Sequence, residues 1–439
     1  MTKYKTYADD LDKWAALQPE KACLITKQIY TYRDIQERAQ AYAQKLRTLG
    51  PRQTLLIVKK EAADQAIAFL GAQKAGWVPI LGHSDVSAEA SIQLAQKQHI
   101  AWLDDGYFTP VCPAAPTPAA DICLGVLSSG STGLPKLMLR TYASWADFFP
   151  TQNEMFQVQQ NTVAFGEGSL SFTGNTNLWL SLLYAGATFV LFSGLHPRSW
   201  LRALAHYRVT LLYLVPVKLK LLLAACQEIY PTVRTVLAGS QLLEKNTVQQ
   251  LRAAFPQSRI ILYYGASEVD YVTWLCDDEL LTHPGSVGRP CPGVKVSIRQ
   301  GLIYIDTPYH VAGLAQPCTL GDCGYFDKDD YLIFQGRQGQ VINKGGLTIS
   351  CSHVEQALQA LDGVQDAAVV PLADAKRGQE LGACLVLKSG VALKKIRQEL
   401  RKLLPPGEIP GKWRAVPALP LGSTGKVDSR KIQALFTAK

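Results

Sequence analysis

Short apolar runs accompany segments of helical periodicity through most of this chain, and this pairing strongly limits the folds that it can adopt. An apolar run at Thr54–Val58 precedes a helical pattern at Ala63–Ala75, and a run at Leu211–Val215 precedes one at Lys218–Cys226. Strands that alternate with helices are typical of a parallel sheet whose faces are covered by helices. The sequence therefore predicts an α/β fold built on doubly wound sheets.

The pattern changes twice, and with 439 residues the chain is long enough for two or three domains. From Pro284 to Asp306 glycine, proline and β-branched residues alternate, which favours a smaller antiparallel β subdomain. Charged, glycine and amide residues interrupt the apolar pattern at Arg337–Asn343, and a small α+β unit follows. We therefore predict a large N-terminal domain at 1–336, a hinge at 337–343 and a C-terminal domain at 344–439.

The apolar stretch Leu178–Phe192 is too short to span a membrane, because a span needs about 20 residues. Ala185-Gly186-Ala187 reads as a turn, so we expect a buried helix that runs into a buried strand. Residues Met1–Asp10 contain no apolar segment of a secretory signal, and the ten cysteines form no Cys-x-x-Cys pair. These features predict a cytoplasmic protein with reduced thiols.

The net charge of +9 is modest for this length, and the basic residues are scattered rather than gathered in one block. A small polyanion suits this charge at least as well as a nucleic acid does.

A loop rich in serine and glycine, Leu127–Lys136, follows the predicted buried strand Ile122–Leu127. Ligands of α/β proteins bind at the carboxyl ends of strands, and such a loop can offer backbone N–H groups, hydroxyls and a cation to phosphates. The spacing differs from a Walker A loop, and a flexible connection is the plainer alternative. The residues that carry this chemistry are Ser128, Ser129, Gly130, Ser131, Thr132, Gly133 and Lys136.

Other stretches carry polar groups with comparable chemistry, although each has a plainer structural explanation. Tyr263-Tyr-Gly-Ala-Ser-Glu268 follows a strand, so it offers an aromatic ring, a hydroxyl and a carboxylate at another strand end. Asp322 can accept bonds from ribose hydroxyls or simply form a turn. Arg337 can be a ligand donor or a surface ion pair, and Lys426 lies in a hydroxyl-rich loop near the C-terminus.

These stretches occur together and in one order, and that combination resembles the adenylate-forming enzymes, which include acyl-CoA synthetases and peptide-synthetase adenylation domains. The resemblance covers nearly the whole chain. It is strongest in the Leu127–Lys136 loop, in Tyr264–Glu268, in Gly336-Arg337 and in Gly425-Lys426. Within the superfamily the chain is similar to short bacterial acyl-CoA ligases, through Arg140-Thr-Tyr-Ala-Ser-Trp145, Gly168-Ser-Leu-Ser-Phe172 and Ser286-Val-Gly-Arg-Pro290.

The resemblance implies that a carboxylic acid, fatty or other, is activated by Mg-ATP to an acyl-adenylate with release of pyrophosphate. CoA then displaces AMP, and the C-terminal domain is mobile between the two half-reactions. Lys426, Glu268 and Lys136 would be catalytic, with Glu268 also binding Mg²⁺. The nucleotide would contact Ser128, Ser129, Gly130, Ser131, Thr132, Gly133, Gly239, Ser240, Gln241, Tyr264, Gly265, Ser267, Asp322 and Arg337. The acid would contact Phe172, Thr173, Gly239 and Tyr263.

Some positions depart from the family pattern. Tyr142 and Phe172 stand where histidine is frequent, and Gly339-Gln340 stand where the hinge usually carries an acidic residue. Relatives that activate amino acids usually have an aspartate at the position of Thr173, so a plain carboxylic acid is expected here. Two alternatives remain open, namely transfer to the phosphopantetheine of an acyl carrier protein and a nucleotide-binding protein without turnover. Neither a nucleic acid nor an integral membrane span is expected.

Overall fold

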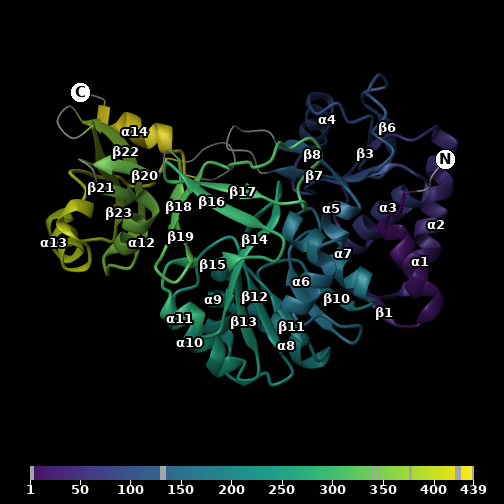
Figure 1. The fold of residues 1–439 in the computed structure, drawn as a ribbon, viewed down its shortest axis with the longest axis horizontal. Coiled ribbons are helices and arrows are strands. Elements are labelled where there is room, and N and C mark those ends of the chain that lie inside the picture. Colours follow the sequence, from purple (N-terminus) through teal and green to yellow (C-terminus); the bar gives the residue numbers. More distant parts are fainter. Residues whose placement is uncertain are drawn as a thin grey trace. The chain divides into compact units, whose positions relative to one another are not determined.

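The structure is a computed structural model that describes residues 4–128, 135–338, 341–344, 347–374, 378–420 and 427–437. The chain forms two compact units (Figure 1). The larger unit contains Met1–Lys295 and Ile305–Gln316, and the smaller unit contains Val296–Tyr304 and Pro317–Lys439. The predicted hinge at 337–343 stays a prediction, and its Gly339 and Gln340 lie outside the described residues.

The larger unit is built on two sheets. The first has the strand order β15-β14-β13-β12-β11-β9-β10-β1-β2, and its central strands from β13 to β1 are parallel. Its strands are β1 (Ala22–Ile25), β2 (Ile29–Thr31), β9 (Val163–Glu167), β10 (Thr188–Phe192), β11 (Leu211–Tyr213), β12 (Thr235–Ala238), β13 (Arg259–Ala266), β14 (Asp270–Cys276) and β15 (Ser286–Pro290). Most residues of the central strands are buried, as expected for a parallel sheet that helices cover.

The second sheet has the order β6-β5-β3-β4-β7-β8, with parallel pairing from β5 to β7. Its strands are β3 (Thr54–Ile57), β4 (Val78–Leu81), β5 (Trp102–Asp104), β6 (Phe108–Pro110), β7 (Ile122–Ser128) and β8 (Lys136–Thr141). The predicted α/β class with parallel sheets is therefore confirmed.

Helices cover these sheets. In Figure 1 the N-terminal helices α1 and α2 lie beside α3, and α1 also contacts α7. The helices of the larger unit are α1 (Tyr7–Leu17), α2 (Tyr32–Leu49), α3 (Ala62–Lys74), α4 (Ala88–Lys97), α5 (Ala143–Ala146), α6 (Phe149–Met155), α7 (Thr173–Ala185), α8 (Pro197–His206), α9 (Pro216–Ala225), α10 (Lys245–Ala254) and α11 (Glu279–Thr282).

The apolar stretch at 178–192 forms a buried helix followed by a buried strand, as predicted. Helix α7 ends at Gly186, whose φ of 72° suits glycine, and β10 begins two residues later. A side chain at Gly186 would collide with the ring of Trp14, because an added Cβ lies 2.6 Å from Cδ2. No described helix is both long enough and apolar enough to cross a membrane.

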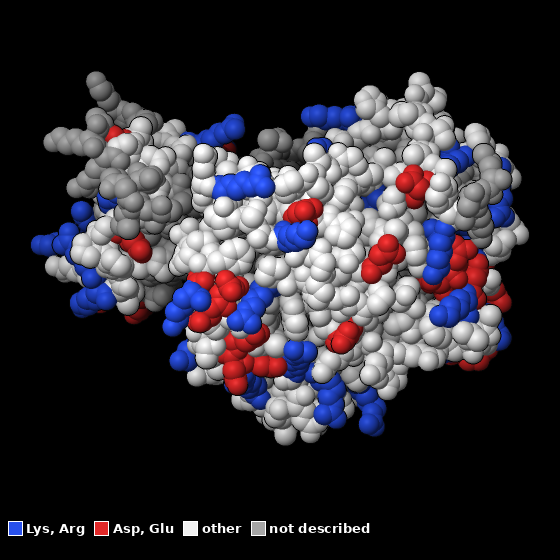
Figure 2. Space-filling view, in the orientation of Figure 1, with Lys and Arg blue, Asp and Glu red and all other residues white. Residues whose placement is uncertain are grey.

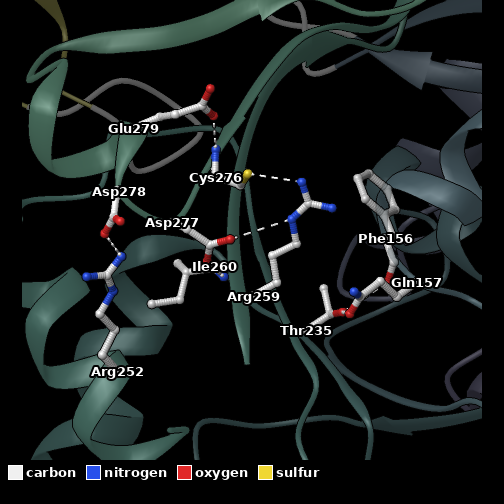
Figure 3. A network of polar contacts seen from close by, with 10 residues as sticks. All are labelled: Phe156, Gln157, Thr235, Arg252, Arg259, Ile260, Cys276, Asp277, Asp278 and Glu279. Atoms are coloured by element: carbon white, nitrogen blue, oxygen red, sulfur yellow. Dashed lines mark hydrogen bonds and ion pairs between the residues drawn. The ribbon is translucent and has the colours of Figure 1, made fainter. Parts of the chain in front are cut away.

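A polar network fixes the start of the β13–β14 hairpin (Figure 3). Arg259 is the first residue of β13, and its guanidinium donates to Cys276 Sγ at 3.2 Å and lies 3.6 Å from Asp277 Oδ2. Asp277 in turn accepts a hydrogen bond of 2.9 Å from the backbone N–H of Ile260. These contacts hold the register of the two strands, whose opposite end forms the turn at 267–269.

The smaller unit contains an antiparallel ladder and a second sheet with helices on both faces. The ladder joins β17 (Leu302–Asp306), β18 (Asp322–Phe326) and β19 (Leu332–Arg337), next to β16 (Lys295–Arg299). The second sheet contains β20 (Val341–Lys344), β21 (Leu347–Ser350), β22 (Val364–Asp374), β23 (Gly378–Leu387) and β24 (Lys412–Ala415). The helices are α12 (Cys351–Gln359), α13 (Leu393–Leu403) and α14 (Ser429–Thr437), with a 3₁₀ turn at Pro406–Glu408.

Side chains along β22 point alternately to the two faces of the β20–β24 sheet, so this sheet packs against a separate core on each face. Ala367 and Val369 pack with α12 and α13, whereas Ala368 and Val370 pack with Ile432 of α14. A buried ion pair stands at the end of β20, where Lys344 Nζ lies 2.6 Å from Glu380 Oε1 and donates to the carbonyl of Ile409 at 3.0 Å.

Candidate functional site

The parallel strands of the first sheet bring distant parts of the sequence to one edge. The register pairs Gly166 of β9 with Tyr213 of β11, and Tyr213 with Leu237 of β12. Leu237 pairs in turn with Ile261 of β13. Because all four strands point the same way, the residues that follow them meet at the carboxyl edge, where α/β proteins bind ligands.

Gly239 lies at this edge, directly against the ring of Tyr263. An added Cβ on Gly239 would lie 2.3 Å from Cζ of Tyr263, so the position has no room for a side chain. Ser240 and Gln241 follow, and both are exposed, with Ser240 at a φ of 70°. The predicted nucleotide residues after β12 are thus a buried glycine followed by two accessible polar side chains.

The β13–β14 hairpin carries Tyr264 and Gly265 on its strand and Ser267 and Glu268 at its turn. A Cβ on Gly265 would lie 2.4 Å from the carbonyl oxygen of Asp270, so the two strands approach too closely there for a side chain. The hydroxyl of Ser267 donates to Thr173 Oγ1 at 2.9 Å, at the first residue of α7. Two candidate residues 94 positions apart are therefore in direct contact.

Glu268 is half-buried at the turn, and its backbone carbonyl accepts a hydrogen bond of 2.9 Å from Val311 N. Among the described residues, no side chain forms a hydrogen bond or an ion pair with its carboxylate. A carboxylate on a short, anchored turn is the type of ligand that Mg²⁺ accepts. The chemistry of this position therefore fits a magnesium ligand.

Lys136 opens β8 and is exposed, and its backbone pairs with Ser128 at the end of β7. The loop between these two residues, with Ser129, Gly130, Ser131, Thr132 and Gly133, lies outside the described residues, as does Lys426. Their assigned roles stay predictions.

Phe172 precedes α7, and its side chain is 55% exposed with its ring 5.2 Å from that of His83. His83 forms a 2.9 Å hydrogen bond between Nδ1 and Ser171 Oγ, and partial burial lowers the pKa of its imidazole. Phe172 thus lies at the surface beside a polar pair. Trp179 of α7 is 1% exposed and packs edge-on against Phe69, so it belongs to the core.

In the smaller unit, Asp322 and Arg337 lie opposite each other on the antiparallel strands β18 and β19. Asp322 is buried, and Arg337 Nε lies 3.1 Å from its Oδ1 while the arginine side chain remains mostly exposed. The structure therefore brings together two residues that the resemblance assigned to the nucleotide, and Asp322 is the one that we linked to its ribose. Their role in binding it stays a prediction.

Arg140 is a central residue of the site that we did not select from the sequence. It is fully buried on β8, and its guanidinium donates to the carbonyls of Ser267 at 2.8 Å and Tyr309 at 3.1 Å. The guanidinium also donates to Ser144 Oγ at 3.2 Å, and its central carbon lies 4.7 Å from the ring centroid of Trp145. The only sequence signal was its place in the Arg140–Trp145 stretch, because a single arginine gives no indication that it is buried.

Asp270 is a second residue that sequence reasoning missed. It begins β14 with a φ of 62°, a conformation that aspartate tolerates, and it is 7% exposed. Its Oδ1 accepts from Asn177 Nδ2 at 3.2 Å, whereas Oδ2 has no hydrogen-bond partner among the described residues. Burial raises the pKa of this carboxyl to about 7, with Arg140 and the backbone of Tyr271 opposing the shift.

The Asp270→Asn variant is expected to change how stability depends on pH. The raised pKa means that the folded state keeps the proton between about pH 4 and pH 7 while the unfolded chain releases it, so this carboxyl costs stability as pH rises through that window. Asparagine carries no charge to desolvate. Chemical denaturation at pH 4, 6 and 8 should show that the unfolding free energy of the variant rises relative to that of wild type as the pH increases. The difference should reach at most about 4 kcal/mol and stay constant above pH 7. Parallel stability curves for the two proteins would contradict the assignment.

Charges on the face drawn in Figure 2 are mixed in sign. Lysine and arginine side chains stand among aspartate and glutamate side chains, with broad uncharged areas between them. Where described residues are drawn, this face therefore carries no extended basic surface of the kind that binds a nucleic acid backbone.

Comparisons with known proteins agree with this geometry. Residues 80–302 match the family model of the AMP-binding enzymes, and residues 353–426 match the AMP-binding enzyme C-terminal domain. YhfT of Bacillus subtilis, which is named as an uncharacterized acyl-CoA ligase, is 27% identical over 325 residues, which cover 70% of this chain and 67% of that protein. A protein of Staphylococcus epidermidis named as a long chain fatty acid-CoA ligase, VraA, is 22% identical over 95% of this chain and 96% of its own length.

Solved structures share the fold. The o-succinylbenzoate CoA synthetase MenE of Bacillus subtilis, in complex with the acyl-adenylate OSB-AMP, superposes with a TM-score of 0.85 at 20% identity and covers 97% of each chain. The same synthetase has been solved with ATP and a magnesium ion, at a TM-score of 0.85 and 19% identity. MatB from Rhodopseudomonas palustris with bound ATP gives a TM-score of 0.81 at 18% identity, over 98% of this chain and 99% of that one.

Proposed function

Because the chain belongs to the AMP-binding enzymes, we propose that it is an ATP-dependent ligase that joins a carboxylic acid to CoA. In the first half-reaction an oxygen of the acid attacks the α-phosphorus of ATP. The bond to the β-phosphate breaks, and acyl-adenylate and pyrophosphate form. In the second half-reaction the thiol sulfur of CoA attacks the acyl carbonyl, its proton is lost, and AMP leaves with the electron pair of the broken C–O bond.

One observation carries this proposal. The contact of 2.9 Å between Ser267 and Thr173 joins the hairpin turn proposed for the α-phosphate and the metal to the helix start proposed for the acid. Tyr264, proposed to flank adenine, lies on the same hairpin, and Gly239 lies on the neighbouring strand end. An acid at Thr173 and a phosphate at Ser267 would therefore be neighbours, as the attack requires.

The reaction brings a carboxylate to a triphosphate, so cations must offset the repulsion between two anions. Lys136 supplies one cation at the start of β8 for the β- and γ-phosphates. Lys426 supplies another for the carboxylate and the α-phosphate. The serine- and glycine-rich sequence between Ser128 and Lys136, most of which lies outside the described residues, would be suited to offer further N–H donors to the departing pyrophosphate.

Glu268 would hold the magnesium ion, since its carboxylate is anchored through the backbone and otherwise unpaired among the described residues. A bound Mg²⁺ would neutralise phosphate charge. Asp322 would accept the hydrogen bonds of ribose hydroxyls, and Arg337, which pairs with it at 3.1 Å, would hold that carboxylate in place.

The acid is a plain carboxylic acid. Thr173 offers a neutral hydroxyl already bonded to Ser267, so no carboxylate at that position pairs with a substrate ammonium. An α-amino acid would therefore lose its ammonium hydration without a compensating charge there.

Substrate-dependent exchange of radiolabelled pyrophosphate into ATP tests the proposal, with a panel of carboxylic acids and matched α-amino acids. We expect exchange with at least one plain acid, and stoichiometric AMP and acyl-CoA once CoA is added. Release of ADP, or exchange with no acid, would contradict the proposed reaction.

A further inference from the structure

The space between the first turn of α7 and the strand ends is occupied by tyrosine side chains. Tyr213 is the last residue of β11 and is 8% exposed. Its hydroxyl and that of Tyr263 lie 2.8 Å apart and share a hydrogen bond. The ring of Tyr263 in turn packs edge-on against that of Tyr271, with centroids 4.5 Å apart. Three strands thus contribute to one continuous aromatic layer.

This layer touches backbone on both sides. An added Cβ on Gly174, the second residue of α7, would lie 2.2 Å from the Tyr213 hydroxyl and 3.5 Å from the Tyr263 hydroxyl. An added Cβ on Gly239 would lie 2.3 Å from Cζ of Tyr263. Real Cβ atoms essentially never approach within 3.0 Å, so a methyl group at either position would force a tyrosine side chain to move. Without such a movement, a chain of methylene groups has no room to pass between the tyrosines and this backbone.

We propose that Tyr213 and Tyr263 form the end wall of the acid pocket and restrict this chain to short carboxylic acids. The proposal rests on the proposed function, which places the acid at Thr173, and on the resemblance, which adds Gly239 and Tyr263 to the residues that contact it. A long acyl chain normally gains affinity from each buried methylene, but here each further methylene meets a filled space. The chain thus differs in expected substrate from VraA, whose name specifies long chain fatty acids.

One side chain of this wall sets the depth of the proposed acid pocket. The Tyr213 hydroxyl is the atom nearest to a Cβ added at Gly174, and its ring carbon Cζ follows at 3.3 Å. Removing the ring opens the pocket, whereas removing the hydroxyl alone leaves the ring in place. Tyr213 is therefore the specificity-determining residue, and Tyr213→Phe is the matched control for Tyr213→Ala.

Pyrophosphate exchange should be measured with acetate, butyrate, octanoate and palmitate for wild type, Tyr213→Ala and Tyr213→Phe. We expect wild type to prefer butyrate over palmitate by about tenfold or more in kcat/KM, because a pocket boundary discriminates single methylenes by such factors. Tyr213→Ala should shift the optimum toward octanoate, and Tyr213→Phe should keep the wild-type order. If wild type turned over palmitate as efficiently as butyrate, the size limit would be overturned and the proposed function would remain intact. Exchange with no acid would overturn both.

A second experiment tests the packing without any substrate. Replacing glycine by alanine in a compatible backbone conformation reduces the entropy of the unfolded chain, so Gly174→Ala should stabilise the protein unless the new methyl group clashes with Tyr213. We expect a lower melting temperature for Gly174→Ala and recovery of most of that loss in Gly174→Ala with Tyr213→Phe, where the nearest wall atom becomes Cζ at 3.3 Å. The assignment of Tyr213 as the pocket wall would be contradicted if Gly174→Ala melted at the same temperature as wild type. It would also be contradicted if the double variant melted no higher than Gly174→Ala.

Discussion

The Lys426→Ala variant is expected to form acyl-adenylate about 10²–10³ times more slowly than wild type, since loss of one donor to developing charge costs about that much. The first half-reaction sets a carboxylate against a triphosphate, and Lys426 is the cation proposed to stand between them. The second half-reaction starts from an acyl-adenylate that no longer bears the triphosphate, so its rate should change little. Pyrophosphate exchange measures the first step, and thioester formation from supplied acyl-adenylate and CoA measures the second.

Lys402→Ala is the matched control, because Lys402 is an exposed lysine of the same unit whose nearest acidic partner is Glu399 at 2.8 Å. This variant should leave both half-reactions near wild type, as expected for an exposed ion pair. An equal loss in both half-reactions of Lys426→Ala would show a general defect of binding or folding. No loss in either would remove Lys426 from the mechanism.

The sequence predicted the fold well because hydrophobic periodicity records burial directly. Fully buried parallel strands such as Thr54–Ile57 appear as short apolar runs, and the buried helix and strand at 173–192 appear as one apolar stretch broken by Gly186. Helix α14 at Ser429–Thr437 was not predicted. Its inward residue Ile432 packs on a sheet face that only the three-dimensional arrangement creates.

The candidate site was predictable where its residues follow strands, and less so where side chains meet across the fold. Ser267 was named from its own stretch and Thr173 from the family resemblance, but their contact depends on how α7 lies over the carboxyl edge. Tyr213 was missed because it ends an unremarkable strand, Leu211–Tyr213, and its importance comes from Gly174 on another element. Aromatic residues at strand ends usually belong to the core, so composition alone gives no indication of a pocket wall.

Asp270 illustrates a further limit of sequence reasoning. An aspartate after a turn is usually a surface residue, and the sequence shows nothing of the burial that raises its pKa to about 7. Its carboxyl and the Arg140 guanidinium are opposite charges that influence each other inside one buried region of the larger unit. Arg140 therefore contributes twice to this region: its charge interacts with Asp270, and its guanidinium donates a hydrogen bond to the backbone of the hairpin turn.

The Arg140→Ala variant is expected to lose about 3–5 kcal/mol of unfolding free energy, because each buried acceptor left without its donor costs about 1–3 kcal/mol and the deleted side chain leaves a cavity. The deletion would leave the carbonyls of Ser267 and Tyr309 without their donor and would place a cavity beside Trp145. Because Glu268 directly follows Ser267, the folded variant should also need a higher magnesium concentration for half-maximal pyrophosphate exchange. Arg140→Lys keeps the charge but cannot reach the same carbonyls with a planar fork, so it should recover only part of the stability.

Arg299→Ala supplies the matched control for this last prediction. Arg299 is an exposed arginine whose guanidinium also lies over an aromatic ring, 4.7 Å from the centroid of Tyr304. Its deletion removes the same atoms and a similar ring contact without uncovering buried carbonyls, so urea denaturation should show a change within about 0.5 kcal/mol. If Arg140→Ala lost no more than Arg299→Ala, the buried guanidinium would not be what holds the hairpin turn. If stability fell but the magnesium requirement did not move, Arg140 would support the fold without positioning Glu268.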